Sequence, residues 1–230
     1  MFPLRDTIPS KGLPVATWIL ILANLGAFAF ELHCSERELA RMTFELGVVP
    51  ALVVDPGARH QLGLDGHPWL GFLTSQFLHA GWIHLLSNLW CLWIFGDNVE
   101  DKLGALRFLA FYLLSGIAAS ALHVYTQPES TVPAIGASGA IAGVMGAYFV
   151  LFPTARVVTL VPVFIVPLFF EVPAFVFLLF WFATQFFSGM LALGSASTSG
   201  GIAWWAHVGG FLAGIVLLAL LRPRRAARNA

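Results

Sequence analysis

Three apolar segments of the chain each carry polar residues that could take part in acyl transfer. Ser138 lies in "IGASGAIAGVMG", His207 lies in "IAWWAHVGGFLAG", and "HAGWIHLLSN" contains His84 and Asn88. A serine hydroxyl is a weak nucleophile until a neighbouring base takes its proton. Histidine is the usual base because its pKa lies near neutral pH. Ser138 and His207 therefore predict a nucleophile and its general base.

His84 and Asn88 could supply the hydrogen-bond donors that acyl transfer needs. They are four residues apart, so they share one face of a helix. Attack on a peptide bond creates a tetrahedral oxyanion, which positioned donors stabilise. The Asn88 amide, a ring nitrogen of His84 and the backbone N–H of Ser138 are candidates. A helix that begins at Ser138 would also favour negative charge at that position.

Each of these residues also has a purely structural interpretation. The "GASG" sequence is typical of small-residue packing between membrane helices. It also departs from the hydrolase pattern Gly-x-Ser-x-Gly, because Ala140 stands at the last position. His207, and the pair of His84 and Asn88, could be hydrogen-bonding residues between helices. The joint pattern in three segments favours a site.

The elements that position these residues are predicted to cross a membrane. The chain has 230 residues, of which 58% are hydrophobic and only 10% are charged. Soluble domains carry about 25% charged residues, so we predict an all-α, polytopic membrane protein. The formal net charge is zero, and nothing suggests a nucleic-acid partner. The two cysteines, Cys34 and Cys91, show no metal-binding spacing.

Six apolar stretches are long enough, some only loosely, to form membrane-spanning helices of about 20 residues. They are residues 14–33, 80–96, 106–124, 138–153, a stretch that begins near Glu171, and 202–221. Glu171 and Pro173 suit the N-terminus of the fifth helix. The preceding segment 157–170 is β-branched and interrupted twice by proline. We therefore interpret it as a buried or interfacial connection rather than a seventh span.

Basic residues are distributed unevenly along the chain, and this distribution sets the orientation. Both termini are expected to be cytoplasmic, with residues 1–13 as an N-terminal segment, 14–221 as the membrane domain and 222–230 as a basic tail. The second, fourth and sixth spans then enter from the outer face, which places the serine and both histidines at a similar shallow depth. Nine of the twelve basic residues would lie on the cytoplasmic side: Arg5, Lys11, Lys102, Arg107, Arg156, Arg222, Arg224, Arg225 and Arg228.

Glycines recur beside the serine and beside the histidine of the sixth span. Small faces of this kind let membrane helices approach closely. Close approach of the fourth and sixth spans is what a serine on one and a histidine on the other would require. The glycines lie at spacings of three or four along these two spans: Gly139, Gly143, Gly146, Gly210 and Gly214.

Together these segments resemble the rhomboid family of intramembrane serine proteases. The resemblance covers residues 14–221 and rests on "HLLSN" in the second span, "GASG" at the fourth and "AHVGGFLAG" in the sixth. Each motif is weak alone, but all three in this order on alternate spans are specific. The resemblance implies a six-helix membrane protease with a dyad, in which Ser138 is the nucleophile and His207 is the general base and acid. It assigns the oxyanion hole to His84, Asn88 and the Ser138 backbone N–H.

The resemblance also implies packing roles, partners and a location. Gly136 would shape the loop that leads into the serine, while Gly139, Gly210 and Gly214 would let the helices pack near the site. The implied substrates are transmembrane segments of membrane proteins, cleaved near the outer face of the lipid bilayer, and no metal or organic cofactor is implied. We expect a multi-pass integral protein of a bacterial cytoplasmic membrane.

The sequence departs from some family members at the position four residues after the serine. It has Ala142 there, where those members carry a tyrosine that stacks on the catalytic histidine. A neighbouring aromatic residue could hold His207 instead, and Gln185 in the Phe-rich fifth span could form a hydrogen bond across helices. His79 and His123, near the ends of spans, are interpreted as surface or loop residues.

Two other classes of function stay open at this point. A catalytically inactive rhomboid-like protein that binds client transmembrane helices would carry a similar sequence. A small transporter could use the polar residues to bind a solute, but transporters typically place such a site at the midplane between broken helices. A serine-reactive fluorophosphonate probe, compared between the wild type and Ser138→Ala, would distinguish the protease from both.

Overall fold

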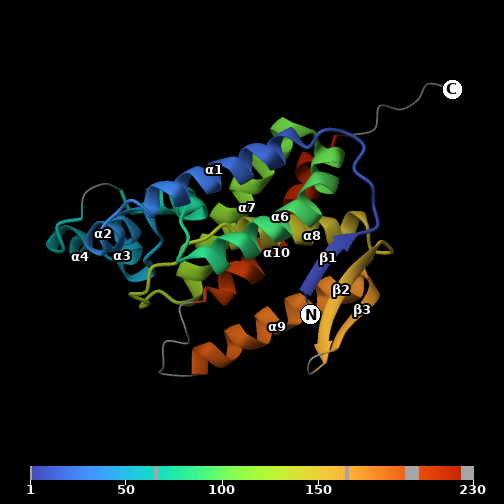
Figure 1. The fold of residues 1–230 in the computed structure, drawn as a ribbon. Coiled ribbons are helices and arrows are strands. Elements are labelled where there is room, and N and C mark those ends of the chain that lie inside the picture. Colours follow the sequence, from blue (N-terminus) through green and yellow to red (C-terminus); the bar gives the residue numbers. More distant parts are fainter. Residues whose placement is uncertain (1, 65–66, 164–165, 195–201, 224–230) are drawn as a thin grey trace.

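The chain is mostly helical, as predicted (Figure 1). The computed structural model describes residues 2–64, 67–163, 166–194 and 202–223. Six long helices lie close to the six predicted stretches, although the second extends well beyond its predicted end at residue 96. They are α1 (Val15–Glu31), α6 (Trp82–Leu103), α7 (Ala105–Thr126), α8 (Ser138–Leu151), α9 (Ala174–Gly194) and α10 (Trp204–Leu221).

Helix α8 lies at the centre of this bundle. Every residue from Gly139 to Tyr148 is buried, and α8 packs against α6, α7 and α10. A helix that is apolar on all faces is stable when other elements surround it. The burial therefore fixes α8, and with it the serine at its first position.

Three of the described helices are long and apolar enough to cross a membrane. These are residues 105–126, 174–193 and 204–221, which lie in α7, α9 and α10. Two shorter apolar helices, α1 and α8, lie beside them. Helix α6 ends in the charged sequence "GDNVEDKL", which explains why its predicted apolar stretch was shorter than the helix. Glu100 in that sequence is buried, and its carboxylate accepts hydrogen bonds from the backbone N–H groups of Ala16 and Thr17 at 2.9 and 2.8 Å.

The long first loop contains short helices and contacts the segment that precedes α8. They are α2 (Glu36–Leu46), α3 (Pro50–Val54), α4 (Pro56–Gln61), η1 (Pro68–Leu70), α5 (Gly71–Thr74) and η2 (Ser75–Phe77). Val48 and Ala134 form an isolated antiparallel bridge, and the Gly136 N–H donates to the Ser75 carbonyl at 2.8 Å. The first loop thus fixes the backbone just before Ser138.

A three-stranded sheet shows that the predicted all-α class is incomplete. Strands β1 (Phe2–Asp6), β2 (Arg156–Val163) and β3 (Val166–Pro173) form an antiparallel sheet in the order β1-β2-β3. Segment 157–170, predicted to be a buried or interfacial connection, therefore forms most of a hairpin, and β3 is largely exposed. Its β-branched residues favour strands. Glu171 lies opposite Val158 in the hairpin, so the prediction that it begins a helix was wrong, because α9 begins at Ala174.

The sheet is tied to the end of α8 that lies away from Ser138. The Tyr148 hydroxyl donates to the Asp6 carboxylate at 2.5 Å, and the Asn98 amide donates to the same oxygen at 2.9 Å. Burial of Asp6 raises the pKa of its carboxyl above the ordinary value. Strand β1, α6 and α8 are thereby joined at one polar point, which anchors α8 at both ends.

Candidate active site

Ser138 and His207 come from two different helices and meet side by side. Ser138 is the first residue of α8, and His207 lies in the first turn of α10. The His207 Nε2 and Ser138 Oγ atoms are 2.8 Å apart, a normal hydrogen-bond length. Both side chains are partly buried. The structure therefore brings together the two residues that the sequence predicts as nucleophile and base.

Glycine contacts explain how α8 and α10 come close enough for this pair to form. A Cβ atom added at Gly210 would collide with the Gly139 carbonyl oxygen, and one added at Gly214 would collide with the Gly143 carbonyl oxygen. On the α8 side, a Cβ at Gly146 would collide with the backbone of α10. The helices therefore touch backbone to backbone, a contact that only residues without a side chain permit.

His84 and Asn88 lie against the loop that leads into Ser138. Gly136 in this loop has a φ of +123°, which L-residues rarely adopt, and a Cβ added there would lie 2.6 Å from His84 Nε2 and 3.7 Å from Asn88 Nδ2. The backbone of Gly136 thus approaches both side chains. Its backbone conformation and the lack of space each favour glycine at this position.

The hydrogen-bond partners of these two side chains leave donors directed at the loop. Asn88 is buried, and its Nδ2 has no partner among the described residues. The Ala80 N–H lies 3.4 Å from His84 Nδ1. An Nδ1 that accepts a hydrogen bond in the neutral ring leaves the proton on Nε2, the nitrogen that faces Gly136. Both side chains can therefore donate toward the start of α8.

The N-terminus of α8 adds backbone donors at the same place. The first hydrogen bond of the helix runs from the Ile141 N–H to the Ala137 carbonyl at 3.0 Å. The N–H groups of Ser138, Gly139 and Ala140 have no helical carbonyl before them, as at every helix start. They and the helix dipole favour negative charge beside the Ser138 hydroxyl.

Three side chains contact the His207 ring. The chain has Ala142 at the position where some family members carry a tyrosine that stacks on this ring. The ring centroids of Trp181 and Trp204 lie 5.9 and 6.3 Å from that of His207, with interplanar angles of 37° and 89°. Gln185 Oε1 lies 2.8 Å from His207 Nδ1. These contacts match the expectation that a neighbouring aromatic residue could hold His207 and that Gln185 could form a hydrogen bond across helices.

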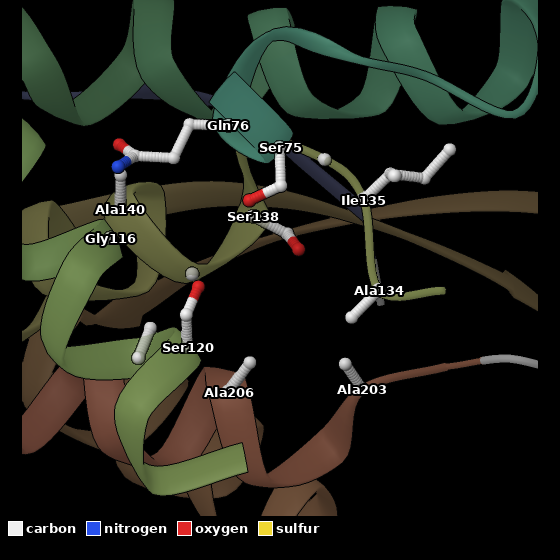
Figure 2. Close-up of a pocket in the computed structure, with 13 residues that line it drawn as sticks. Ser75, Gln76, Gly116, Ser120, Ala134, Ile135, Ser138, Ala140, Ala203 and Ala206 are labelled. Atoms are coloured by element: carbon white, nitrogen blue, oxygen red, sulfur yellow. The ribbon is translucent and has the colours of Figure 1, made fainter. Parts of the chain in front are cut away.

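A small cavity opens beside Ser138 (Figure 2). It has a volume of about 30 Å³, enough to hold water. Figure 2 shows the Ser138 hydroxyl at this cavity, with Ser75 on one side and, on another, Ala206 of α10 and Ala203, which comes just before that helix. Most of the other lining residues are small, including Gly116, Ala119, Ser120, Ala134, Gly136, Gly139 and Ala140.

Two histidines that were interpreted as surface or loop residues are buried. His79, in the loop before α6, is 3% exposed, and His123 in α7 is 5% exposed. The His79 N–H donates to the Glu31 carboxylate at 3.1 Å, and its ring contacts that of His84, with centroids 5.1 Å apart. Burial lowers the pKa of His79 to about 4, so its ring is neutral at pH 7. Position in the sequence could not reveal this, because the first loop folds back over the helix ends.

Among the described residues, the ionisable side chains do not gather into a group with the composition of a metal site. In the part of the chain that the structure describes, no three His, Cys, Asp or Glu side chains lie close enough to hold a metal ion. Ser138 and His207 are in hydrogen-bond contact, and His84 and Asn88 lie against the loop before Ser138. This arrangement can activate a hydroxyl and stabilise an oxyanion, and acyl transfer requires both.

Comparison with known proteins identifies the domain that holds this group. A model of the Rhomboid domain matches residues 66–224. The chain is 31% identical over 151 residues to "Rhomboid protein 1, mitochondrial" of Saccharomyces cerevisiae, covering 64% of this chain and 40% of that protein. It is 28% identical over 155 residues to rhomboid protease AarA of Providencia stuartii, covering 60% and 51%. It is 32% identical over 123 residues to "Inactive RHOMBOID-like protein 8" of Arabidopsis thaliana, covering 50% and 34%. The chain thus spans about half, or less, of the length of these relatives.

Proposed function

Because the chain belongs to the rhomboid family, we propose that it is an intramembrane serine endopeptidase that cleaves transmembrane segments of other membrane proteins. The observation that carries this proposal is the 2.8 Å contact between His207 Nε2 and Ser138 Oγ. With the ring proton on Nδ1, this contact lets the Nε2 lone pair take the hydroxyl proton. The neighbouring donors at His84 and Asn88 support the same function.

In the proposed reaction, Ser138 Oγ attacks the carbonyl carbon of the scissile peptide bond. His207 Nε2 takes the hydroxyl proton as the bond forms, and later gives it to the leaving amine. The tetrahedral oxyanion is stabilised by Asn88 Nδ2, His84 Nε2 and the Ser138 backbone N–H. Water then hydrolyses the acyl-enzyme with His207 again acting as base, and the cavity beside Ser138 can store that water.

The lining of the cavity supports a preference for small side chains at the cut. Its walls are built mainly from glycine, alanine and serine, and its volume is about 30 Å³. Large side chains do not fit such a space without movement of the helices. The proposal is therefore that the residue on the acyl side of the scissile bond is small, as the family resemblance implies.

We propose that six helices cross the membrane, namely α1, α6, α7, α8, α9 and α10. Three of them meet the length and hydropathy expected for a span, and an even number agrees with the predicted cytoplasmic location of both termini. On this topology, residues 14–221 form the membrane domain between a cytoplasmic segment 1–13 and a basic tail 222–230. We place the protein in a bacterial cytoplasmic membrane, although the family also includes proteins named as mitochondrial.

A panel of single-span membrane proteins tests the proposed function. Each would be reconstituted with the wild type, Ser138→Ala or His207→Ala, and its fragments would be separated by mass. The proposal predicts at least one fragment that requires both Ser138 and His207. Binding of the panel proteins without any Ser138-dependent fragment would favour the alternative, a catalytically inactive rhomboid-like protein that binds client helices.

A further inference from the structure

Gln185 is a buried amide in the middle of a mostly apolar helix. It is 8% exposed, whereas Phe187, two residues further along α9, is 64% exposed. Polar side chains within membrane helices are costly and normally have a specific partner. The partner here is His207 on α10, because Gln185 Oε1 and His207 Nδ1 are 2.8 Å apart. The contact lies on the side of the imidazole opposite Ser138.

The neighbouring hydroxyl determines which end of the Gln185 amide faces the histidine. Thr184 Oγ1 donates its single proton to the Trp181 carbonyl at 2.6 Å. It can therefore only accept from Gln185, whose Nε2 lies 3.0 Å away. With Nε2 engaged as a donor, the carbonyl oxygen Oε1 is the atom that faces His207.

This orientation determines the tautomer of the imidazole. Because Oε1 can only accept a hydrogen bond, His207 Nδ1 must carry the proton. In the neutral ring, Nε2 then has a free lone pair, and this is the nitrogen 2.8 Å from Ser138 Oγ. The reversed amide would place a donor on Nδ1 and force the proton onto Nε2, where it would prevent deprotonation of the serine.

We propose that Gln185 is a positioning residue that holds His207 in the tautomer and ring orientation required of the base. The inference rests on the proposed function of the Ser138 and His207 pair. Gln185 has two effects on His207. It fixes which ring nitrogen carries the proton, and it restrains a ring that the small Ala142 side chain cannot cover. Trp181 and Trp204 contact the ring but cannot select a tautomer.

Two variants remove the amide while keeping a side chain of similar size, namely Gln185→Leu and Gln185→Met. Without the Gln185 carbonyl oxygen, the Nδ1–H tautomer of His207 is no longer enforced, but the ring can still adopt it. We expect kcat to fall about 10- to 100-fold with little change in KM, less than the roughly 10⁴-fold loss when a triad member enforces the wrong tautomer. Phe187→Leu is the matched control on the same helix, and it should leave kcat unchanged because this side chain faces outward.

The pH profile separates positioning from a general structural defect. The Gln185 carbonyl stabilises the protonated imidazole more than the neutral one, because hydrogen bonds to charged groups are stronger. Removing it should therefore move the acidic limb of the kcat/KM profile to lower pH. A merely structural loss would lower activity equally at every pH. The nearby titratable groups His84 and His123 are unchanged in all variants.

A spectroscopic readout tests the inference without any substrate. Nitrogen-15 NMR of histidine-labelled protein, with His207 assigned by His207→Ala, reports which ring nitrogen carries the proton. We expect the Nδ1–H tautomer in the wild type and a shift toward Nε2–H in Gln185→Leu and Gln185→Met. Wild-type tautomer and an unchanged pH profile in folded variants would overturn the role of Gln185. Absence of Ser138-dependent cleavage in the wild type would instead overturn the proposed function, whatever the tautomer.

Discussion

Replacing Gly210 by alanine is a direct way to separate α8 from α10. The added Cβ would collide with the Gly139 carbonyl oxygen, which belongs to the backbone of α8 and has no rotamer to change. Gly139 follows Ser138, and Gly210 lies one turn after His207. A displacement at this contact therefore acts on the pair itself.

The size of the effect follows from the contact distances. Real Cβ atoms essentially never come within 3.0 Å of such an atom, and the added Cβ would lie well inside this distance from the Gly139 oxygen, so the helices must separate by on the order of 1 Å. The 2.8 Å contact between His207 Nε2 and Ser138 Oγ would then exceed the length of a hydrogen bond. A misplacement of about 1 Å can cost about 100-fold in rate, and overpacking costs about 1–3 kcal/mol of stability.

The assay is the rate of fluorophosphonate labelling of purified protein, measured on the folded fraction and accompanied by thermal unfolding. Gly26→Ala is the matched control, because it makes the same change within helix α1, where no atom lies within 4 Å of the added Cβ. We expect Gly210→Ala to label about 100-fold more slowly and Gly26→Ala to label like the wild type. Folded Gly210→Ala that labels within twofold of the wild type would refute the argument that this contact sets the dyad distance.

Three further predictions address other parts of the molecule. Asn88→Ala should lower kcat about 10²- to 10³-fold with little change in KM, as expected for one lost oxyanion donor, and an unchanged kcat in the cleavage assay would remove Asn88 from the site. Glu100→Ala should lower stability by roughly 1–3 kcal/mol, because it leaves buried N–H groups of α1 unpaired, while the folded fraction still labels with the probe; an unaltered thermal midpoint would contradict this. Burial raises the pKa of Asp6 above 3.8, so its ionisation costs stability as the pH rises through that value toward the raised pKa. Asp6→Asn keeps an acceptor for Tyr148 and removes this cost, so the thermal midpoint of Asp6→Asn should rise relative to that of the wild type as the pH increases from 3.8 until Asp6 is ionised in the folded protein, and a difference that is constant with pH would argue against the explanation.

Much of the arrangement around Ser138 was predictable because it depends on motifs that carry their own geometry. A helix start at Ser138, the i, i+4 relation of His84 and Asn88, and the glycines of α8 and α10 all follow from local sequence. Order along the chain then places the second, fourth and sixth helices in alternation. Such features need no knowledge of how distant segments pack.

Other features depended on tertiary contacts that local sequence does not encode. The sheet needs strand β1 from the N-terminus to pair with β2, which lies some 150 residues later, so the hairpin alone looked like an irregular connection. His79 is buried because the end of the first loop packs against α1, where the Glu31 carboxylate accepts a hydrogen bond from the His79 backbone N–H. Gln185 was visible as an isolated polar residue, but its partner on α10 could not be read from the sequence.

The central claim is that the Ser138 hydroxyl is made nucleophilic by His207. The most direct measurement is to react the protein with a fluorophosphonate and map the modified residue by mass spectrometry in the wild type, Ser138→Ala and His207→Ala. We expect a single adduct on Ser138 in the wild type, no adduct in Ser138→Ala, and a strongly reduced yield in folded His207→Ala. An adduct on another residue, or full labelling of Ser138 without His207, would contradict this claim.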